Sequence, residues 1–238
     1  MTASNTTPTG TTATDASAPR SADAAAALAA RPGQKRLGLL YGGSLPEYRV
    51  LADERFSPWL AKTIYVPELT EESLADLDGL YVPEGSNHRA LQAASETVRA
   101  FLERGKTVLL FGDQPVAWLP GISWEFRPAL SAPKLTAGPI GSNGVAGSSA
   151  ASDHGFHGAV PLIDQIWHHH GILRPPAGAD TLLWTEDGAG VLYVDRASTG
   201  GTLLVTTLDP LRHTGETASP QPTRFLECFL PWVVNDLL

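Results

Sequence analysis

Two short apolar runs with an amphipathic helical segment between them constrain the fold of this chain more than any other feature. The runs are residues 79–83 and 107–111, and apolar positions between them, from Leu91 to Leu102, recur with the 3.6-residue helical period. Asn87 suits the N-cap of that helix and Gly105 its C′ position. Buried strands joined through a helix by short connections predict a parallel sheet with right-handed crossovers.

Further segments extend this pattern in both directions. Apolar runs at residues 36–41 and 63–66 precede it, and runs at 181–186, 191–196 and 202–208 alternate with the glycine-rich turns of consecutive hairpins. We therefore predict an α/β fold: a flavodoxin-like, doubly wound, mostly parallel sheet with antiparallel strands added in the C-terminal half.

The composition changes at two places along the chain. Residues 1–34 form a Thr/Ala/Ser-rich segment without an aromatic residue, which we expect to be a disordered tail because it has too little apolar surface to bury. Residues 35–238 are expected to form a single α/β domain. Within it, residues 128–158 are rich in Gly, Ala and Ser and long for a connection, so they are predicted to be a flexible loop or a lid.

Charge and cysteine content exclude several classes of partner. The formal net charge is -8 and the basic residues form no run, which argues against a nucleic-acid partner. No apolar stretch approaches the length of a membrane span, so we expect no membrane partner. Cys228 is the single cysteine and the N-terminus does not resemble a secretory signal, so we expect a cytoplasmic location. A homodimer is compatible with the apolar C-terminal segment.

Polar and glycine-rich turns follow three of the predicted parallel strands. In an open doubly wound sheet, ligands bind beyond the carboxyl ends of the strands, where the strand order reverses. The candidate ligand-binding residues in these turns are Gly43, Ser44, Gly85, Ser86, Asn87, His88 and Gln114, with Glu84 and Asp113 as acids beside them. The alternative is structural, because glycines make tight turns and Asn87 can simply cap a helix.

Histidine is concentrated in one region: five of the seven lie between positions 154 and 170. In an extended segment, the side chains of His168 and His170 project to one face and His169 to the other. With Asp209, His213, Asp113 or Glu84, these two histidines could hold a divalent metal such as Zn, Fe, Mn or Ni. The alternative is that their imidazoles hydrogen-bond a polar ligand without a metal, since no recognised metal motif is present.

Four stretches together resemble the class I glutamine amidotransferase-like superfamily, in particular its non-amidotransferase branch with the ThuA-like (trehalose-utilisation) proteins. They are residues 78–85, 98–105, 108–113 and 203–210, and the resemblance covers residues 36–238 in outline. In the glutamine-hydrolysing members, a cysteine follows the central strand and a His-Pro pair follows a late strand. The resemblance implies the same fold, and a link to sugar metabolism.

This sequence departs from that family at both catalytic positions. Asp113 stands at the elbow after the central strand, and Asp209 precedes Pro210 after the late strand. Cys228 lies in a predicted amphipathic helix, where a small buried hydrophobe is the ordinary role. Glutamine amidotransferase activity is therefore not expected.

The acids and one histidine at these strand ends are candidates for catalysis: Asp113, Asp209, His213 and Glu84. A carboxylate and an imidazole four residues apart, at Asp209 and His213, could act as base and acid. If Asp113 and Asp209 face each other, as the family's Cys and His do, their proximity should raise the pKa of one of them.

Three functions follow from these patterns. The first is a domain that binds or acts on a small polar molecule, with carbohydrate suggested by the resemblance and by Trp118, Trp124, Trp167 and Trp184 near predicted loops. The second is a non-catalytic regulatory or partner-binding module. The third is a metal-dependent hydrolase built on the histidine cluster.

Overall fold

The computed structural model describes residues 33–128, 135–137, 155–185 and 187–238. Most of the predicted tail at residues 1–34 lies outside the described residues. So does most of the predicted loop or lid at residues 128–158, including His154. Within the described part, no helix combines the length and the apolar composition that crossing a bilayer requires.

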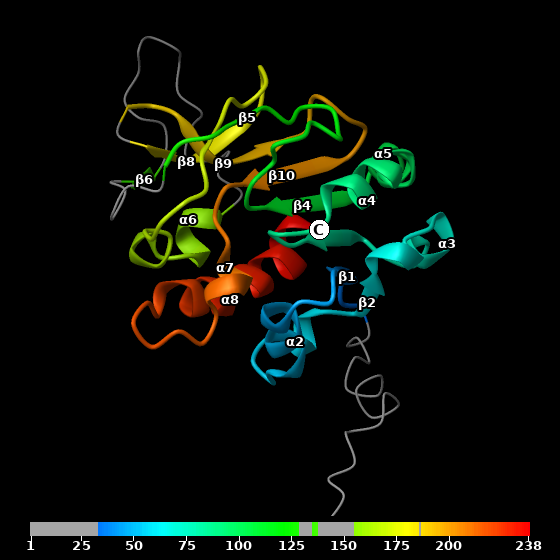
Figure 1. Cartoon of the computed structure of the whole chain (residues 1–238), viewed down its shortest axis with the longest axis horizontal. Helices are drawn as coiled ribbons and strands as arrows, with labels where there is room; N and C mark the ends of the chain where they lie inside the picture. Colours follow the sequence, from blue (N-terminus) through cyan, green and yellow to red (C-terminus); the bar gives the residue numbers. More distant parts are fainter. Residues whose placement is uncertain (1–32, 129–134, 138–154, 186) are drawn as a thin grey trace, which may run out of the picture.

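Strands and helices alternate in the first half, and strands dominate the middle (Figure 1). The strands are β1 (Leu37–Tyr41), β2 (Lys62–Tyr65), β3 (Gly79–Val82), β4 (Thr107–Phe111), β5 (Trp124–Glu125), β6 (Leu135–Ala137), β7 (Ile172–Leu173), β8 (Asp180–Thr185), β9 (Gly190–Asp195) and β10 (Thr202–Thr206). The α-helices are α2 (Leu45–Ala52), α3 (Glu71–Leu74), α4 (His88–Ala93), α5 (Ser95–Glu103), α6 (Phe156–Ala159), α7 (Pro210–His213) and α8 (Gln221–Trp232).

All of these strands belong to one mixed sheet. The order β2-β1-β3-β4-β10 is parallel throughout, which is the flavodoxin-like order with its reversal between β1 and β3. Beyond β10 the strands β9, β8, β7, β6 and β5 pair antiparallel. The predicted fold, with its parallel core and its antiparallel addition, is therefore confirmed.

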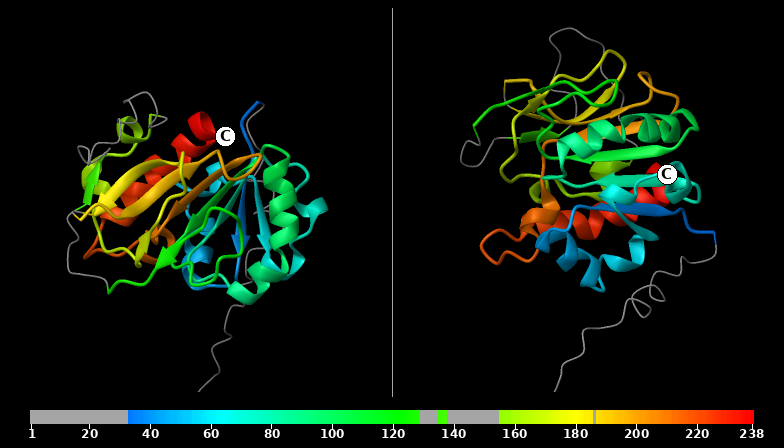
Figure 2. Two further views of the ribbon diagram at one scale, coloured as in Figure 1. Left: turned by 90° about the horizontal axis from the view of Figure 1, so that it is seen from above. Right: turned by 45° about the vertical axis from the view of Figure 1, so that its right-hand side comes forward.

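Alternate side chains of the central strands enter two separate hydrophobic cores. Tyr81 and Leu109 face one core and Leu80 and Leu110 face the other, as the two-residue period of a strand requires. Helices α2, α6 and α8 cover the first face, and α3, α4 and α5 cover the second (Figure 2). Burial on both faces explains why these strands are apolar throughout rather than alternating.

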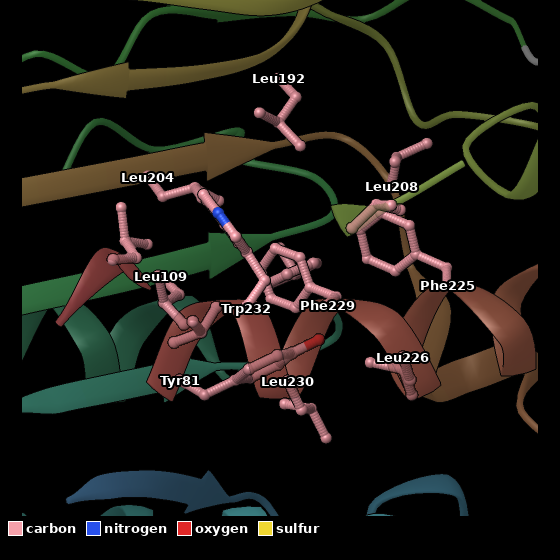
Figure 3. Close-up of a cluster of buried hydrophobic side chains, with 14 of the residues drawn as sticks. Tyr81, Leu109, Leu192, Leu204, Leu208, Phe225, Leu226, Phe229, Leu230 and Trp232 are labelled. Atoms are coloured by element: carbon pink, nitrogen blue, oxygen red, sulfur yellow. The ribbon is translucent and has the colours of Figure 1, made fainter. Parts of the chain in front are cut away.

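Helix α8 lies across the first face and supplies most of its aromatic packing (Figure 3). Phe229 meets Phe111 edge-on with ring centroids 5.4 Å apart, and Phe111 stacks on Tyr81 at 4.3 Å. Cys228 packs partly buried against this same core, and burial raises the pKa of its thiol. A buried thiol with a raised pKa is a poor nucleophile, which fits the structural role expected from the sequence.

Two predicted helices differ in detail from the expectation. Asn87 caps the helix after β3 by accepting hydrogen bonds from Arg89 and Ala90, and Gly105 ends it at φ 76°, both as predicted. The helix is nevertheless divided into α4 and α5, because Ala94 leaves the helical region at φ -91°, ψ 2°. At the C-terminus, the predicted amphipathic helix is α8, which contains Pro231 and passes directly after Trp232 into a π-helix.

The carboxyl ends of β1, β3, β4 and β10 meet at one edge of the sheet, because these strands are parallel. The amide of Gly112 donates to Leu208 O at 3.0 Å and so continues the β4–β10 pairing past the strand ends. Gly112 has φ +77°, and a Cβ atom on it would overlap the side chain of Glu84. Only glycine therefore allows the turns after β3 and β4 to approach this closely.

We expect Gly112→Ala to lower the free energy of unfolding by about 3 kcal/mol, from left-handed backbone strain plus overpacking. Gly105→Ala is the matched control, since Gly105 has φ +76° and a Cβ atom on it would meet nothing within 4 Å, and it should cost only about 1 kcal/mol. Denaturant unfolding of both variants measures this difference. Equal costs would show that the close approach to Glu84 is unimportant.

Candidate functional site

The site is organised around the carboxylate of Asp209, which follows β10 and is only 1% exposed. Its Oδ2 atom lies 2.8 Å from Nε2 of His170 and 3.0 Å from Nε2 of His213. Its Oδ1 atom lies 3.4 Å from Nε2 of His168 and accepts from the indole N–H of Trp167, also at 3.4 Å. Four nitrogen atoms thus surround one buried carboxylate.

The segment carrying His168 and His170 is fixed by backbone contacts before it enters β7. The amide of His170 donates to Thr207 O at 2.9 Å, and the indole of Trp124 donates to His170 O at 2.6 Å. His168 and His170 both reach Asp209. His169 is buried elsewhere, as the predicted alternation requires, and its Nδ1 atom has no partner among the described residues.

Two of the three histidines around Asp209 also contact a second carboxylate. Nδ1 of His170 lies 3.3 Å from Oδ1 of Asp113, which is half exposed at the rim of the site. Nδ1 of His213 lies 3.0 Å from Oε1 of Glu216. Each of these imidazole rings is therefore held between an inner carboxylate, Asp209, and an outer one.

The electrostatics of this cluster favour an ionised Asp209. Burial alone would raise the pKa of Asp209, but the hydrogen bonds from His168 and His170 outweigh it and hold the pKa well below its usual range. The pKa of His170 is raised, mainly by its hydrogen bond to Asp209, although desolvation opposes the shift. The inner carboxylate and His170 thus stabilise each other's charged forms.

The direct contact between Asp113 and Asp209 that the sequence suggested is not found, and the pKa of Asp209 is lowered, chiefly because hydrogen bonds from His168 and His170 outweigh burial. The ring of His170 lies between the two carboxylates and contacts both. The neighbouring acid whose pKa is raised is Glu84.

Glu84 is largely enclosed at the end of β3. Its Oε1 atom accepts a hydrogen bond from the amide of Arg212 at 2.6 Å, and its Oε2 atom is buried without a partner among the described residues. Burial, reinforced by the negative charge of Asp209, raises the pKa of Glu84 to about 8. Glu84 is therefore mostly protonated at neutral pH, beside an ionised Asp209.

Two adjoining hollows open at this edge of the sheet. The smaller has a volume of about 90 Å³, enough for a few water molecules or one small chemical group, and it is lined by Glu84, Gly85, His88, Gly112, Asp113, His170, Asp209 and Arg212. The larger has a volume of about 470 Å³ and is lined by Gly42, Ser44, Pro46, Glu47, Glu84, Gly85, Arg212, His213 and Glu216.

The remaining candidate residues mostly serve the backbone around these hollows. Ser86 bonds Pro83 O, Asn87 caps α4, and Gln114 bonds Phe111 O and the indole of Trp118. Gly43 makes a turn at φ +91°, and Ser44 caps α2 as well as lining the larger hollow. Gly85 and His88 line hollows directly. Their part in ligand binding stays a prediction.

The four tryptophans considered for sugar stacking do not line either hollow. Trp167 and Trp124 instead hold the histidine cluster through their indole N–H groups. Sequence reasoning also missed Glu216 and Arg212. The three-residue spacing from His213 to Glu216 was a usable signal, because it suits contact across one helical turn.

The residues present fit a metal ion. His168, His170, His213 and Asp209 each offer one ligand atom, and these four atoms all lie within 4.8 Å of one another. Imidazole with one carboxylate suits Zn and the neighbouring transition metals. Metal-bound histidines usually donate their second ring N–H to a carboxylate, which is the arrangement of His170 with Asp113 and of His213 with Glu216.

No protein-family model and no curated protein matches this sequence. Solved structures do resemble it, each at 10% identity. A protein from Thermoplasma acidophilum described as a component of GMP synthase has a TM-score of 0.50 at 10% identity over 83% of this chain and 94% of its own. The cytoplasmic protein STM1381 from Salmonella typhimurium LT2 has a TM-score of 0.51 at 10% identity over 84% of this chain and 97% of its own.

The exo-β-1,4-mannosidase Op5Man5 from Opitutaceae bacterium strain TAV5 has a TM-score of 0.48 at 10% identity over 84% of this chain, which spans only 35% of that enzyme. The two fuller likenesses agree with the α/β fold described above. At this identity they show the fold alone, and the glutamine amidotransferase-like and ThuA-like assignments stay predictions.

Glu84→Gln should change how stability depends on pH. The raised pKa of Glu84 contributes stability that is fully present below pH about 4.5 and is lost as pH rises to about 8, because the unfolded chain ionises first. The glutamine side chain cannot ionise, so the free energy of unfolding of the variant should rise relative to that of the wild type across this window, by about 5 kcal/mol. Denaturant unfolding at several pH values measures this. A constant difference between the two proteins would contradict a raised pKa.

Proposed function

We propose that this protein is a metal-dependent hydrolase of a small polar substrate, with His168, His170, His213 and Asp209 holding one divalent transition-metal ion. One observation carries the proposal: two of the histidines lie between the buried Asp209 carboxylate and an outer carboxylate. The four potential ligand atoms are also close enough to share one ion. The cluster borders both hollows, so a substrate could reach it.

The hydrogen-bonding capacity of the histidine rings favours a cluster that holds a metal ion over a cluster without one. Without a metal, both ring nitrogens of His170 face carboxylate oxygens, so both must be donors and the ring must be a cation. The two ring nitrogens of His213 also lie against carboxylate oxygens, and its ring centroid lies only 4.4 Å from that of His168. If a metal were bound, the Nδ1–H groups of His170 and His213 would donate to their outer carboxylates, and their Nε2 atoms would be available as ligands.

Such an ion, when bound, polarises a substrate oxygen and lowers the pKa of bound water. The protein's own residues would then handle protons. Asp113 is an exposed carboxylate at the rim of the smaller hollow and would accept a proton from water. Glu84, protonated at neutral pH, would supply one to a leaving group.

A metal-free binding or regulatory module is the second candidate. It is favoured by the raised pKa of His170, which would give a stable buried ion pair with Asp209 in the absence of any metal. Glutamine hydrolysis is disfavoured, since the elbow after β4 carries Asp113 and the cysteine lies on α8. Metal binding separates the two candidates directly.

We expect the purified full-length chain to take up about one Zn²⁺ or Co²⁺ per molecule, and His213→Ala or Asp209→Asn to reduce the affinity at least about tenfold. Elemental analysis after dialysis gives the stoichiometry, and the visible absorption of Co²⁺ reports its coordination without any substrate. The matched control is His169→Gln, because His169 adjoins the ligands in sequence but does not belong to the group of close ligand atoms. Metal uptake unchanged in His213→Ala would contradict the proposed ligand set.

The outer carboxylates should act as positioning residues. Glu216→Ala leaves all four proposed ligands in place but removes the acceptor for Nδ1 of His213. We expect metal affinity to fall about tenfold to a hundredfold, with stoichiometry unchanged at saturating metal. Competition against a coloured chelator measures the affinity. An unaltered affinity would mean that Glu216 does not orient a ligand.

A further inference from the structure

Arg212 lies where the two hollows adjoin. Both hollows are lined by Glu84, Gly85 and Arg212, so they are neighbouring parts of one cleft. Arg212 is exposed, and its backbone N–H is engaged by Glu84 at 2.6 Å. Among the described residues, no hydrogen bond or ion pair involves its guanidinium group.

A free guanidinium group is uncommon among the arginines of this structure. Ion pairs within the described residues engage Arg36, Arg55, Arg99, Arg104, Arg127, Arg174 and Arg224. Arg49 on α2 and Arg89 on α4, both exposed, resemble Arg212 in having no such partner among the described residues, but both lie outside the two hollows. Of these three arginines, Arg212 is the one that lines the cleft.

The acids around the cleft have other partners. Glu47 accepts from the amides of Gly42 and Ser44, Asp113 contacts His170, and Glu216 contacts His213. Glu84 accepts a hydrogen bond from the backbone N–H of Arg212 and not from its guanidinium group. Among the described residues, no lining acid therefore pairs with the guanidinium group of Arg212.

Resting on the metal centre proposed above, we propose that its substrate is a small oxyanion whose carboxylate or phosphate group is bound by Arg212. The planar guanidinium fork matches either group with two parallel hydrogen bonds. Arg212 immediately precedes His213, so a molecule held by Arg212 in the cleft lies beside the histidine cluster. The shared chemistry is the oxyanion, and Arg212 acts as the residue that selects it.

Calorimetric titration with inorganic phosphate and with acetate tests this proposal on the full-length chain, both metal-free and metal-loaded. We expect the wild type to bind at least one probe in both states, and Arg212→Gln to bind it at least about tenfold more weakly. Stronger binding of phosphate would assign a phosphate substrate, and stronger binding of acetate a carboxylate. Gln at this position keeps the backbone N–H that Glu84 accepts, so the fold should persist, as thermal unfolding checks.

Arg49→Gln is the matched control, because it removes the same charge from an exposed, unpaired arginine outside the cleft. It should bind the probes as the wild type does. Equal binding by Arg212→Gln and the wild type, or no binding of either probe to the wild type, would overturn the proposal. Metal uptake, measured separately, distinguishes the two claims: anion binding without metal uptake would refute the metal centre alone, and metal uptake without anion binding would refute the oxyanion site alone.

Discussion

The buried carboxylate of Asp209 is the constraint on which the site depends. Removing a charged carboxylate from water costs several kcal/mol unless other groups compensate, and here nitrogen atoms from His168, His170, His213 and Trp167 surround it. These residues come from two separate segments, one before β7 and one at α7. Asp209 therefore joins those segments while it holds the imidazoles at one point.

The sheet supplies the geometry that brings these groups together. Parallel pairing of β3, β4 and β10 places Glu84, Asp113 and Asp209 at the same edge. Gly112 allows the turns to approach, and its amide extends the pairing toward Asp209. The segment just before β7 reaches the same edge, because the amide of His170 donates to Thr207 O directly after β10.

Much of the fold could be predicted because it depends on local periodicity. The strand–helix–strand pattern at residues 79–111 and the hairpins after residue 180 follow directly from apolar spacing and turn residues. The grouping of His168 and His170 followed from alternation alone. The position of His170 between Asp113 and Asp209 did not, because it depends on how a segment without regular structure lies against the end of β10.

The other features that the sequence did not predict also depend on which residues the tertiary fold brings together. The pKa of Glu84 is raised by its burial. The guanidinium group of Arg212 has no partner among the described residues, because the acids near it bond to other groups. Neither property can be inferred from the residues that flank Glu84 or Arg212 in the sequence. Likewise, Trp124 supports the cluster through one indole N–H from a position 46 residues before His170.

The most direct measurement is the anomalous diffraction of a crystal of the zinc-loaded protein. We expect one strong peak enclosed by His168, His170, His213 and Asp209, about 2.0–2.1 Å from the histidine Nε2 atoms. A zinc-loaded crystal with no peak at these residues, and with the three imidazoles still bonded directly to Asp209, would contradict the proposed metal centre.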